Sequence, residues 1–289
     1  MASLAQWVAG ARPRTLPAAT APVIVGTAAA AAIGESDLAL AVLALVVALS
    51  LQIGVNYAND YSDGIRGTDE ERVGPVRLVG QRLADPENVK LMAFAFFGCG
   101  ALAGLALVAL AQTWVLIPLG ALAILAAWRY TGGDNPYGYR GLGEIYVFVF
   151  FGLMATLGTQ YTQAHEITVA GVLGAVAAGS LSSAILVANN LRDIPTDVES
   201  GKRTLAVRLG DDGTRVLYLA LVGVAAVCTL AMAIWHVFAP VALLGFLVLL
   251  PGIRAITGGA TGRALVPAIG TTGLALLAWS VLLAYPLAR

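Results

Sequence analysis

Two polar stretches in an otherwise apolar sequence carry the side chains that could do chemistry. The first, N-Y-A-N-D-Y-S-D-G-I-R-G-T-D at residues 56–69, follows a long apolar run, and the second, at residues 189–204, follows another. A carboxylate in a membrane helix costs about 2.5–3.5 kcal/mol on insertion scales and usually serves a site. We therefore predict that the two stretches together bind one metal ion and one diphosphate.

Oxygen ligands recur at helical spacing in the first stretch. Asn56, Asp60 and Asp63 are four and three residues apart, so they share one face if the helix continues through them. Oxygen ligands without histidine or cysteine suit a hard cation, and we predict Mg²⁺. Magnesium prefers one or two carboxylates plus phosphate oxygens, which is what two acidic stretches around one diphosphate would supply.

The second stretch repeats this spacing. Asp193 and Asp197 are four residues apart, and Asn189 lies one turn earlier. Pro195 between them predicts that the helix is irregular or ends there. The same Asn-x-x-x-Asp pattern thus closes two apolar runs, and it predicts a weak internal repeat.

Basic residues accompany both acidic stretches. Arginine can hold diphosphate oxygens in a two-pronged fashion, and lysine can do so as a point charge. Each of these residues is accounted for about equally well as an ordinary cytoplasmic charge, and those closest to the aspartates rank first. The candidates are Arg66, Arg72, Arg77, Arg192, Lys202 and Arg203.

A glycine- and tyrosine-rich strip, Y-T-G-G-D-N-P-Y-G-Y-R-G-L-G-E, runs from Tyr130 to Glu144. It is either a flexible loop at the membrane interface or a lid that binds an acceptor. Glu144 falls just inside an apolar run, where a charge is less easily explained as an ordinary surface residue than it would be in a loop.

The amino-acid composition indicates the class of protein that positions these residues. The sequence is 58% hydrophobic and 12% charged, whereas a soluble domain carries about a quarter charged residues. Its mean hydropathy is +0.81. We predict an all-α, multi-pass membrane protein, because several apolar runs are long enough to cross a bilayer. The nine predicted spans are 15–33, 38–59, 88–111, 114–130, 142–163, 167–191, 213–235, 238–257 and 264–286.

Lysine and arginine indicate the orientation. With nine spans, all the basic loop residues fall on one side, and only Arg289 falls on the other. This side is predicted to be cytoplasmic, which places the candidate site on the cytoplasmic face of the cell membrane. The net charge of zero argues against a nucleic-acid partner. The predicted organisation is a single domain over residues 1–289, with two four-helix units at about 15–130 and 142–257 and a ninth helix at 264–286.

The quoted motifs, with R-P-R-T-L-P near the start and N-N-L-R-D-I-P-T-D in the second stretch, resemble the UbiA-type intramembrane prenyltransferases. The strip P-Y-G-Y-R-G-L-G-E is similar to the branch of that family that uses 1,4-dihydroxy-2-naphthoate. Many relatives read N-D-x-x-D-x-x-x-D. The last position of that pattern falls on Gly67 here, and Asp69, two residues later, is the candidate for the missing carboxylate.

The resemblance implies helices around a central cavity that opens to lipid, with cytoplasmic loops capping it. It implies transfer of a polyprenyl group from polyprenyl diphosphate to 1,4-dihydroxy-2-naphthoate in the menaquinone pathway, with loss of the carboxylate, giving demethylmenaquinol, diphosphate and CO₂. The implied cofactor is Mg²⁺. The implied catalytic residues are Asp60, Asp63, Asp193 and Asp197, and the implied metal ligands are these four with Asn56, Asp69 and Asn189.

Aromatic side chains are expected to stabilise an allylic cation through their faces, although tyrosines at the membrane interface need no such role. The candidates for binding the acceptor or the prenyl chain are Tyr57, Tyr61, Tyr130, Tyr139 and Glu144.

Other functions stay open at this point. A sister prenyltransferase would use another acceptor, such as 4-hydroxybenzoate or homogentisate. A secondary transporter also uses intramembrane carboxylates, but it places them near the bilayer midplane rather than at helix ends. An EF-hand is unlike this sequence, because Tyr61 would occupy a chelating position.

Overall fold

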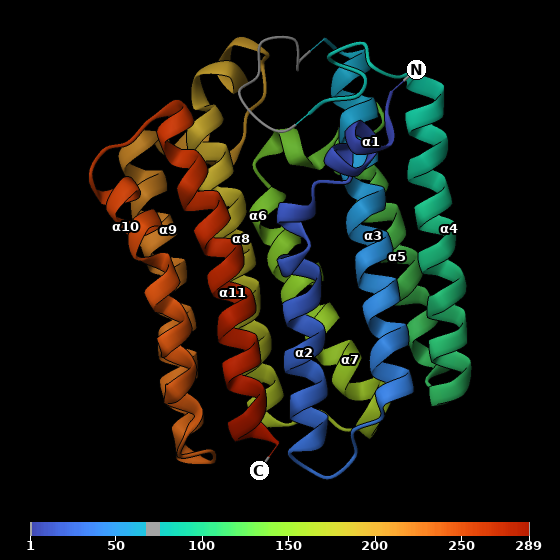
Figure 1. Ribbon diagram of the computed structural model, residues 1–289, viewed down its shortest axis with the longest axis vertical. Coiled ribbons are helices and arrows are strands. Elements are labelled where there is room, and N and C mark those ends of the chain that lie inside the picture. Colours follow the sequence, from blue (N-terminus) through green and yellow to red (C-terminus); the bar gives the residue numbers. More distant parts are fainter. Residues whose placement is uncertain (1, 68–75, 289) are drawn as a thin grey trace.

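The protein is a bundle of helices (Figure 1). The computed structural model describes residues 2–67 and 76–288, and no strand occurs among them. Two predicted site residues, Asp69 and Arg72, lie outside the described residues.

Most of the predicted spans coincide with long apolar helices. Among the described residues, seven helices are long and apolar enough to cross a membrane. They are α3 (Leu38–Ile65), α4 (Pro86–Ala111), α6–η4–α7 (Gly143–Ala164), α8 (Val169–Glu199), α9–η5 (Leu205–Ile234), η6–α10 (Ala239–Thr257) and η7–α11 (Gly262–Leu287). The predicted multi-pass helical membrane protein is confirmed.

The other two predicted spans correspond to shorter apolar helices, α2 (Pro17–Ala31) and η2–α5 (Trp114–Arg129). Within the composite helices, α5 begins at Ile117, α6 ends at Val147, and the π-helical turn η4 (Phe148–Met154) leads into α7 (Ala155–Ala164). Farther along, α9 ends at Ala231, α10 begins at Leu250 and α11 begins at Val266. A short helix α1 (Leu4–Gly10) and a turn η1 (Pro13–Thr15) precede α2.

The predicted C-terminal ends of two helices at the candidate site were wrong. The span predicted over 38–59 continues to Ile65, and the span predicted over 167–191 continues to Glu199. A hydropathy pattern ends where the apolar run ends, but here the polar turns beyond it are buried by other segments and stay helical. On α3, residues 76–85 pack so closely that a Cβ at Gly64 would lie 2.4 Å from Val79.

Of the two outcomes predicted for Pro195, an irregular helix or a helix end, the second does not occur: α8 continues through it to Glu199, and the predicted loop over 192–212 is much shorter. Proline removes one backbone hydrogen bond but leaves the next turn able to form. There, the Thr196 hydroxyl donates to the Asp193 carbonyl at 3.0 Å, and Asp197 on the same turn is buried. The next helix, α9 (Leu205–Ala231), begins after the cap residue Thr204 and is broken at Gly210, where φ is 71°.

The core lies where α2, α8, α9, α10 and α11 meet, and small residues dominate it. Polar side chains join these helices inside the core. Trp279 Nε1 donates to Thr229 Oγ1 at 2.9 Å, and the hydroxyls of Tyr218 and Thr272 lie 2.7 Å apart. Such bonds between membrane helices contribute on average about 0.6 kcal/mol each. The predicted division into two four-helix units stays a prediction, since this core draws on both.

The two chain ends lie at opposite ends of the bundle (Figure 1). The N-terminus and α1 lie at the end where α3 and α8 finish, and the C-terminus lies at the other. The polar turns of α3 and α8 are therefore brought to one end of the molecule.

Candidate active site

A cavity of about 1620 Å³ runs through the bundle between α2, α3, α4, α5, α7, α8 and α11. Its wall on α3 extends from Ala44 to Asp63, which is about 28 Å at 1.5 Å per residue. Most of the lining is apolar. Polar residues of both predicted stretches line the end formed by the last turns of α3 and α8: Asn56, Asn59, Asp63, Asn189, Arg192, Asp197 and Lys202.

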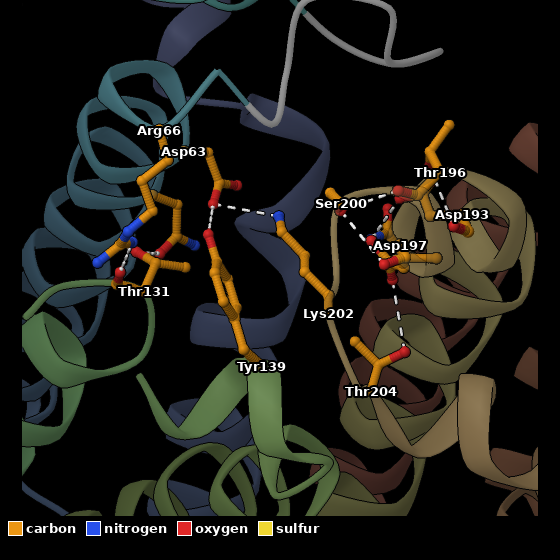
Figure 2. A network of polar contacts seen from close by, with 12 residues as sticks. Asp63, Arg66, Thr131, Tyr139, Asp193, Thr196, Asp197, Ser200, Lys202 and Thr204 are labelled. Atoms are coloured by element: carbon orange, nitrogen blue, oxygen red, sulfur yellow. Dashed lines mark hydrogen bonds and ion pairs between the residues drawn. The ribbon is translucent and has the colours of Figure 1, made fainter. Parts of the chain in front are cut away.

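Asp63 joins the first stretch to the second (Figure 2). Its Oδ1 atom lies 3.2 Å from Nζ of Lys202, and both side chains are buried. The Tyr139 hydroxyl, on the turn η3 (Tyr137–Arg140), donates to the same carboxylate oxygen. Lys202 Nζ also lies 4.5 Å from the centroid of the Tyr139 ring. Three segments distant in sequence therefore meet at one carboxylate.

The turn after α8 places Lys202. Gly201 has φ of 73°, a conformation that costs glycine little, and it allows the chain to reverse here. The Lys202 backbone N–H then donates to the Asp197 carbonyl at 2.8 Å, and the Thr204 hydroxyl donates to Asp197 Oδ2 at 3.4 Å. Asp197, Lys202 and Thr204 all line the cavity.

Arg192 and Asp193 form a buried pair on α8. The guanidinium donates through Nε and Nη2 to the two carboxylate oxygens, each at 2.7 Å. Arg192 also donates to Asn189 Oδ1 at 2.9 Å. Arg192 and Asn189 line the cavity, whereas Asp193 does not. In this arrangement Asp193 orients Arg192.

Asp60 and Asn56 hold neighbouring segments. The Asp60 carboxylate accepts the backbone N–H groups of Leu78 at 2.7 Å and Val79 at 3.1 Å, and it does not line the cavity. Asn56 Nδ2 donates to the Ala11 carbonyl at 2.8 Å. Asp60 thus holds residues 76–85 onto α3, and Asn56 holds the segment between α1 and α2.

Arg66 is bonded to the glycine-rich strip. Its guanidinium donates to the backbone carbonyls of Thr131 and Gly133, and the Thr131 hydroxyl donates to Asn59 Oδ1 at 2.8 Å. Arg66 does not line the cavity. Arg203 is exposed, and its backbone N–H donates to the Tyr139 carbonyl at 2.9 Å. Both arginines are thus placed beside the strip.

The candidate tyrosines fall into two groups. Tyr130 and Tyr139 line the cavity, whereas Tyr57 and Tyr61 do not. The Tyr57 hydroxyl donates to the Trp7 carbonyl at 2.8 Å, and Tyr61 stacks on Trp128 with ring centroids 6.2 Å apart. The structure therefore brings only two of the four tyrosines to the cavity.

Several cavity residues were not singled out from the sequence. Tyr137 and Tyr146 stack with centroids 3.8 Å apart and, with Tyr130, form an aromatic wall. Burial, and then the neighbouring Tyr130 and Tyr146, raise the pKa of Tyr137. Its hydroxyl donates to the Ala126 carbonyl at 2.9 Å. The many tyrosines of the glycine-rich strip are the sequence feature that could have pointed to Tyr137. Asn190 was also missed, although it directly follows Asn189 in the sequence.

The oxygen donors suit a hard cation shared with phosphate. No group of three or more His, Cys, Asp or Glu residues is placed to hold a metal ion among the residues that the structure covers. Asp63 and Asp197, with the amides of Asn59 and Asn189, line the same cavity. Magnesium held by one or two carboxylates takes its remaining ligands from phosphate and water, so these residues fit it without a closed cage.

The cavity is mostly apolar along its length and ends in carboxylates and buried cations, which suits a ligand with a long apolar chain and a charged head group. Residues 19–261 match the model of the UbiA prenyltransferase family, and the chain belongs to that family. The resemblance noted in the motifs is confirmed.

Two curated relatives cover most of the chain. The protein described as 1,4-dihydroxy-2-naphthoate octaprenyltransferase from Mycobacterium tuberculosis is 55% identical over 288 residues, covering 100% of this chain and 98% of that protein. The protein of the same description from Escherichia coli is 43% identical over 250 residues, covering 84% and 80%. The fold is shared with a UbiA homolog from Archaeoglobus fulgidus solved bound to DMAPP and Mg²⁺, with a TM-score of 0.69 at 14% identity, covering 96% of this chain and 99% of that one.

Proposed function

We propose that this chain transfers a polyprenyl group from a polyprenyl diphosphate to 1,4-dihydroxy-2-naphthoate, with loss of the ring carboxylate. The products are demethylmenaquinol, diphosphate and CO₂. The observation that carries the proposal is the ion pair of Asp63 and Lys202, which joins the two acidic stretches at one end of a long apolar cavity. The two relatives described above support this choice of acceptor.

The proposed arrangement in the membrane has nine crossings. They are the seven long helices together with α2 and η2–α5, two helices short for a bilayer that local thinning of the membrane would accommodate. The site end is proposed to face the cytoplasm, since the basic connections accompany it. The cavity is proposed to open laterally to lipid, which would admit a donor that is itself a lipid.

Asp63 and Asp197, with Asn59 and Asn189, are proposed to hold Mg²⁺ and through it the diphosphate. Mg²⁺, when bound, offsets the negative charge that develops on the departing diphosphate. The predicted ligands Asp60 and Asp193 are proposed to act through the segments that they hold, residues 76–85 and Arg192.

Lys202 and Arg192 are proposed to bind the diphosphate oxygens directly. Both are buried in the cavity wall, where charge-assisted hydrogen bonds are stronger than in water. As the allylic C–O bond breaks, its electron pair leaves with the diphosphate, and these two cations stabilise the resulting charge. The faces of Tyr130 and Tyr139 stabilise the allylic cation, and the apolar lining excludes water from it.

The ring carbon that carries the carboxylate then donates an electron pair to the allylic cation and forms the new C–C bond. Loss of CO₂ returns the electrons of the carboxylate bond to the ring, which restores its aromaticity. The hydroxyl groups feed electron density into the ring at both stages, so a hydroxylated acceptor is required.

The test supplies purified protein with Mg²⁺, octaprenyl diphosphate and three acceptors in equal amounts. The acceptors are 1,4-dihydroxy-2-naphthoate labelled in its carboxyl carbon, 4-hydroxybenzoate and homogentisate. We expect release of labelled CO₂ with a prenylated naphthoquinol as the main product, and loss of turnover when Mg²⁺ is chelated. A main product from either other acceptor would instead assign a sister activity, and the absence of any prenylated product would contradict prenyl transfer.

A further inference from the structure

Glu144 and Asn190 form a buried polar pair beside the cavity. Asn190 Nδ2, on α8, donates to Glu144 Oε1, on α6, at 2.9 Å. Glu144 is 6% exposed and Asn190 is 7% exposed. Asn190 lines the cavity, whereas Glu144 is not among the described residues that do so. The carboxyl group therefore reaches the cavity only through the amide.

The chemistry of the pair fixes which way the amide points. Glu144 Oε1 accepts from the NH₂ group of Asn190, and an amide turned the other way would bring its own oxygen against that acceptor. With Nδ2 committed to Glu144, Oδ1 is the atom left for the cavity. Among the contacts of the described residues, this oxygen accepts no hydrogen bond. It is an acceptor site in a wall that is otherwise mostly apolar.

Glu144 keeps one oxygen that could accept a further hydrogen bond, which a purely structural pair would not need. Its Oε2 atom is buried and has no hydrogen-bond partner in the described part of the chain. Leaving a buried carboxylate oxygen unsatisfied lowers stability, and an amide in place of the carboxylate would be less costly to bury. The presence of a carboxyl group here is explained if the site requires an acceptor that fixes the amide of Asn190.

We propose that Glu144 is a positioning residue that turns the amide oxygen of Asn190 into the cavity, where it accepts a hydrogen bond from a hydroxyl group on the aromatic acceptor. This inference rests on the proposed function and adds to it a residue that selects a hydroxylated ring. A hydrogen bond accepted from the hydroxyl leaves more electron density on oxygen and ring, which favours attack on an allylic cation. The proton remains on the hydroxyl oxygen throughout.

The experiment measures binding in the absence of a prenyl donor, with Mg²⁺ and inorganic diphosphate present. The two probes are 1-hydroxy-2-naphthoate and 1-methoxy-2-naphthoate, which share the ring and carboxylate and differ in the ability to donate. The readout is the ratio of their dissociation constants, methoxy over hydroxy. This ratio cancels general damage to the cavity, which would weaken both probes alike.

Three variants of the pair make graded predictions. Replacing both partners by apolar groups of similar shape, Glu144→Met with Asn190→Leu, preserves packing and is expected to lower the ratio roughly 3- to 10-fold, the value of one hydrogen bond. Glu144→Gln lets Asn190 take either orientation and is expected to lower the ratio about twofold, because the competent orientation is then only half populated. Glu144→Gln with Asn190→Asp reverses the pair and is expected to restore the ratio, since the carboxylate introduced by the second change offers only oxygens to the cavity.

The matched control is Ser183→Ala. Ser183 donates to the backbone carbonyl of Glu144 at 3.1 Å and does not touch its carboxylate, so the ratio should stay at the wild-type value. If wild type binds both probes and the ratio is the same in all pair variants, the positioning role is overturned while the proposed function stands. A ratio that also falls in Ser183→Ala would equally overturn it. If wild type binds neither naphthoate, the proposed function fails and the inference fails with it.

Discussion

Tyr139 connects more of the candidate site than any other single residue described above. Its hydroxyl donates to Asp63, its ring lies beneath Lys202, and Arg66 lies 5.5 Å from the ring centroid. These contacts come from α3 and from the turn after α8. The position of the Asp63 carboxylate therefore depends on one side chain of the glycine-rich strip.

We predict that Tyr139→Phe lowers kcat/KM for the polyprenyl diphosphate about tenfold. The change removes a hydrogen bond to a charged group but keeps the ring under Lys202. Tyr139→Leu removes the ring as well and should cost about a further two- to thirtyfold, the range from an exposed to a buried cation–π contact. Steady-state kinetics with the polyprenyl diphosphate varied would measure both losses.

The control is Tyr61→Phe. The ring of Tyr61 stacks on Trp128 away from the cavity, so this variant should stay near wild type. Wild-type kinetics in Tyr139→Phe would remove its hydroxyl from the site.

Residue types and spacing pointed to the two polar stretches that the structure brings to one end of the cavity, but they did not separate the side chains that line it from those that do not. Asp60 and Asp63 are three residues apart, yet Asp60 binds the backbone of residues 78–79 while Asp63 faces the cavity. The difference depends on where residues 76–85 pack, which is a long-range contact with no local signature. For the same reason Tyr57 and Tyr61 look equivalent to Tyr130 in the sequence but face other helices.

At the scale of elements, the glycine-rich strip is held to α3 by Arg66. The guanidinium donates to two backbone carbonyls of the strip, and the Thr131 hydroxyl adds a bond to Asn59. Backbone carbonyls of a connection that lacks regular structure need such partners when they are buried. Arg66 is thus better explained as a tether than as a diphosphate ligand in this arrangement.

We expect Arg66→Ala to loosen the strip and to raise the rate of tryptic cleavage at Arg140, which is exposed at its end. Limited proteolysis of the detergent-solubilised protein, with the fragment identified by mass, would measure this. Arg215→Ala is the matched control, because Arg215 holds a different connection through the carbonyls of Ile256 and Ala260. It should leave cleavage at Arg140 unchanged. An unchanged rate at Arg140 in Arg66→Ala would contradict the tether.

Hydropathy located the long helices well but not their ends at the site. The apolar runs of α3 and α8 stop several residues before the helices do, and Pro195 is an additional stop signal. Buried contacts from residues 76–85 and from the turn at Gly201 decide the outcome instead. The sequence therefore predicts helix positions, while tertiary packing determines how far each helix carries its polar turns.

At the scale of the whole molecule, the cavity extends well beyond the polar end. Its lining on α7 includes Gly158, which lies beyond the π-helical turn η4 from Glu144. A Cβ added at Gly158 would meet no atom within 4 Å. The wall there is open enough for a long apolar chain. Neither the volume nor the continuity of this space could be read from the sequence, because both result from how separate helices pack.

We predict that Gly158→Phe reduces kcat/KM for octaprenyl diphosphate roughly tenfold or more while changing that for geranyl diphosphate less than about threefold. The added ring projects into the distant part of the cavity, which a short donor does not occupy. Gly223→Phe on α9 is the control, since its Cβ also meets nothing within 4 Å and Gly223 does not line the cavity. Equal losses for the two donors in Gly158→Phe would show that the chain does not follow this path.

The proposal that the two acidic stretches form one diphosphate site is tested most directly by Mg²⁺-dependent binding of inorganic diphosphate. The proteins compared are wild type, Asp63→Asn, Asp197→Asn and the double variant. If both carboxylates hold one ligand, each single change should weaken binding about tenfold or more, and the double change should cost less than the sum by about 1 kcal/mol or more. Losses that simply add, or wild-type affinity in either single variant, would contradict a shared site.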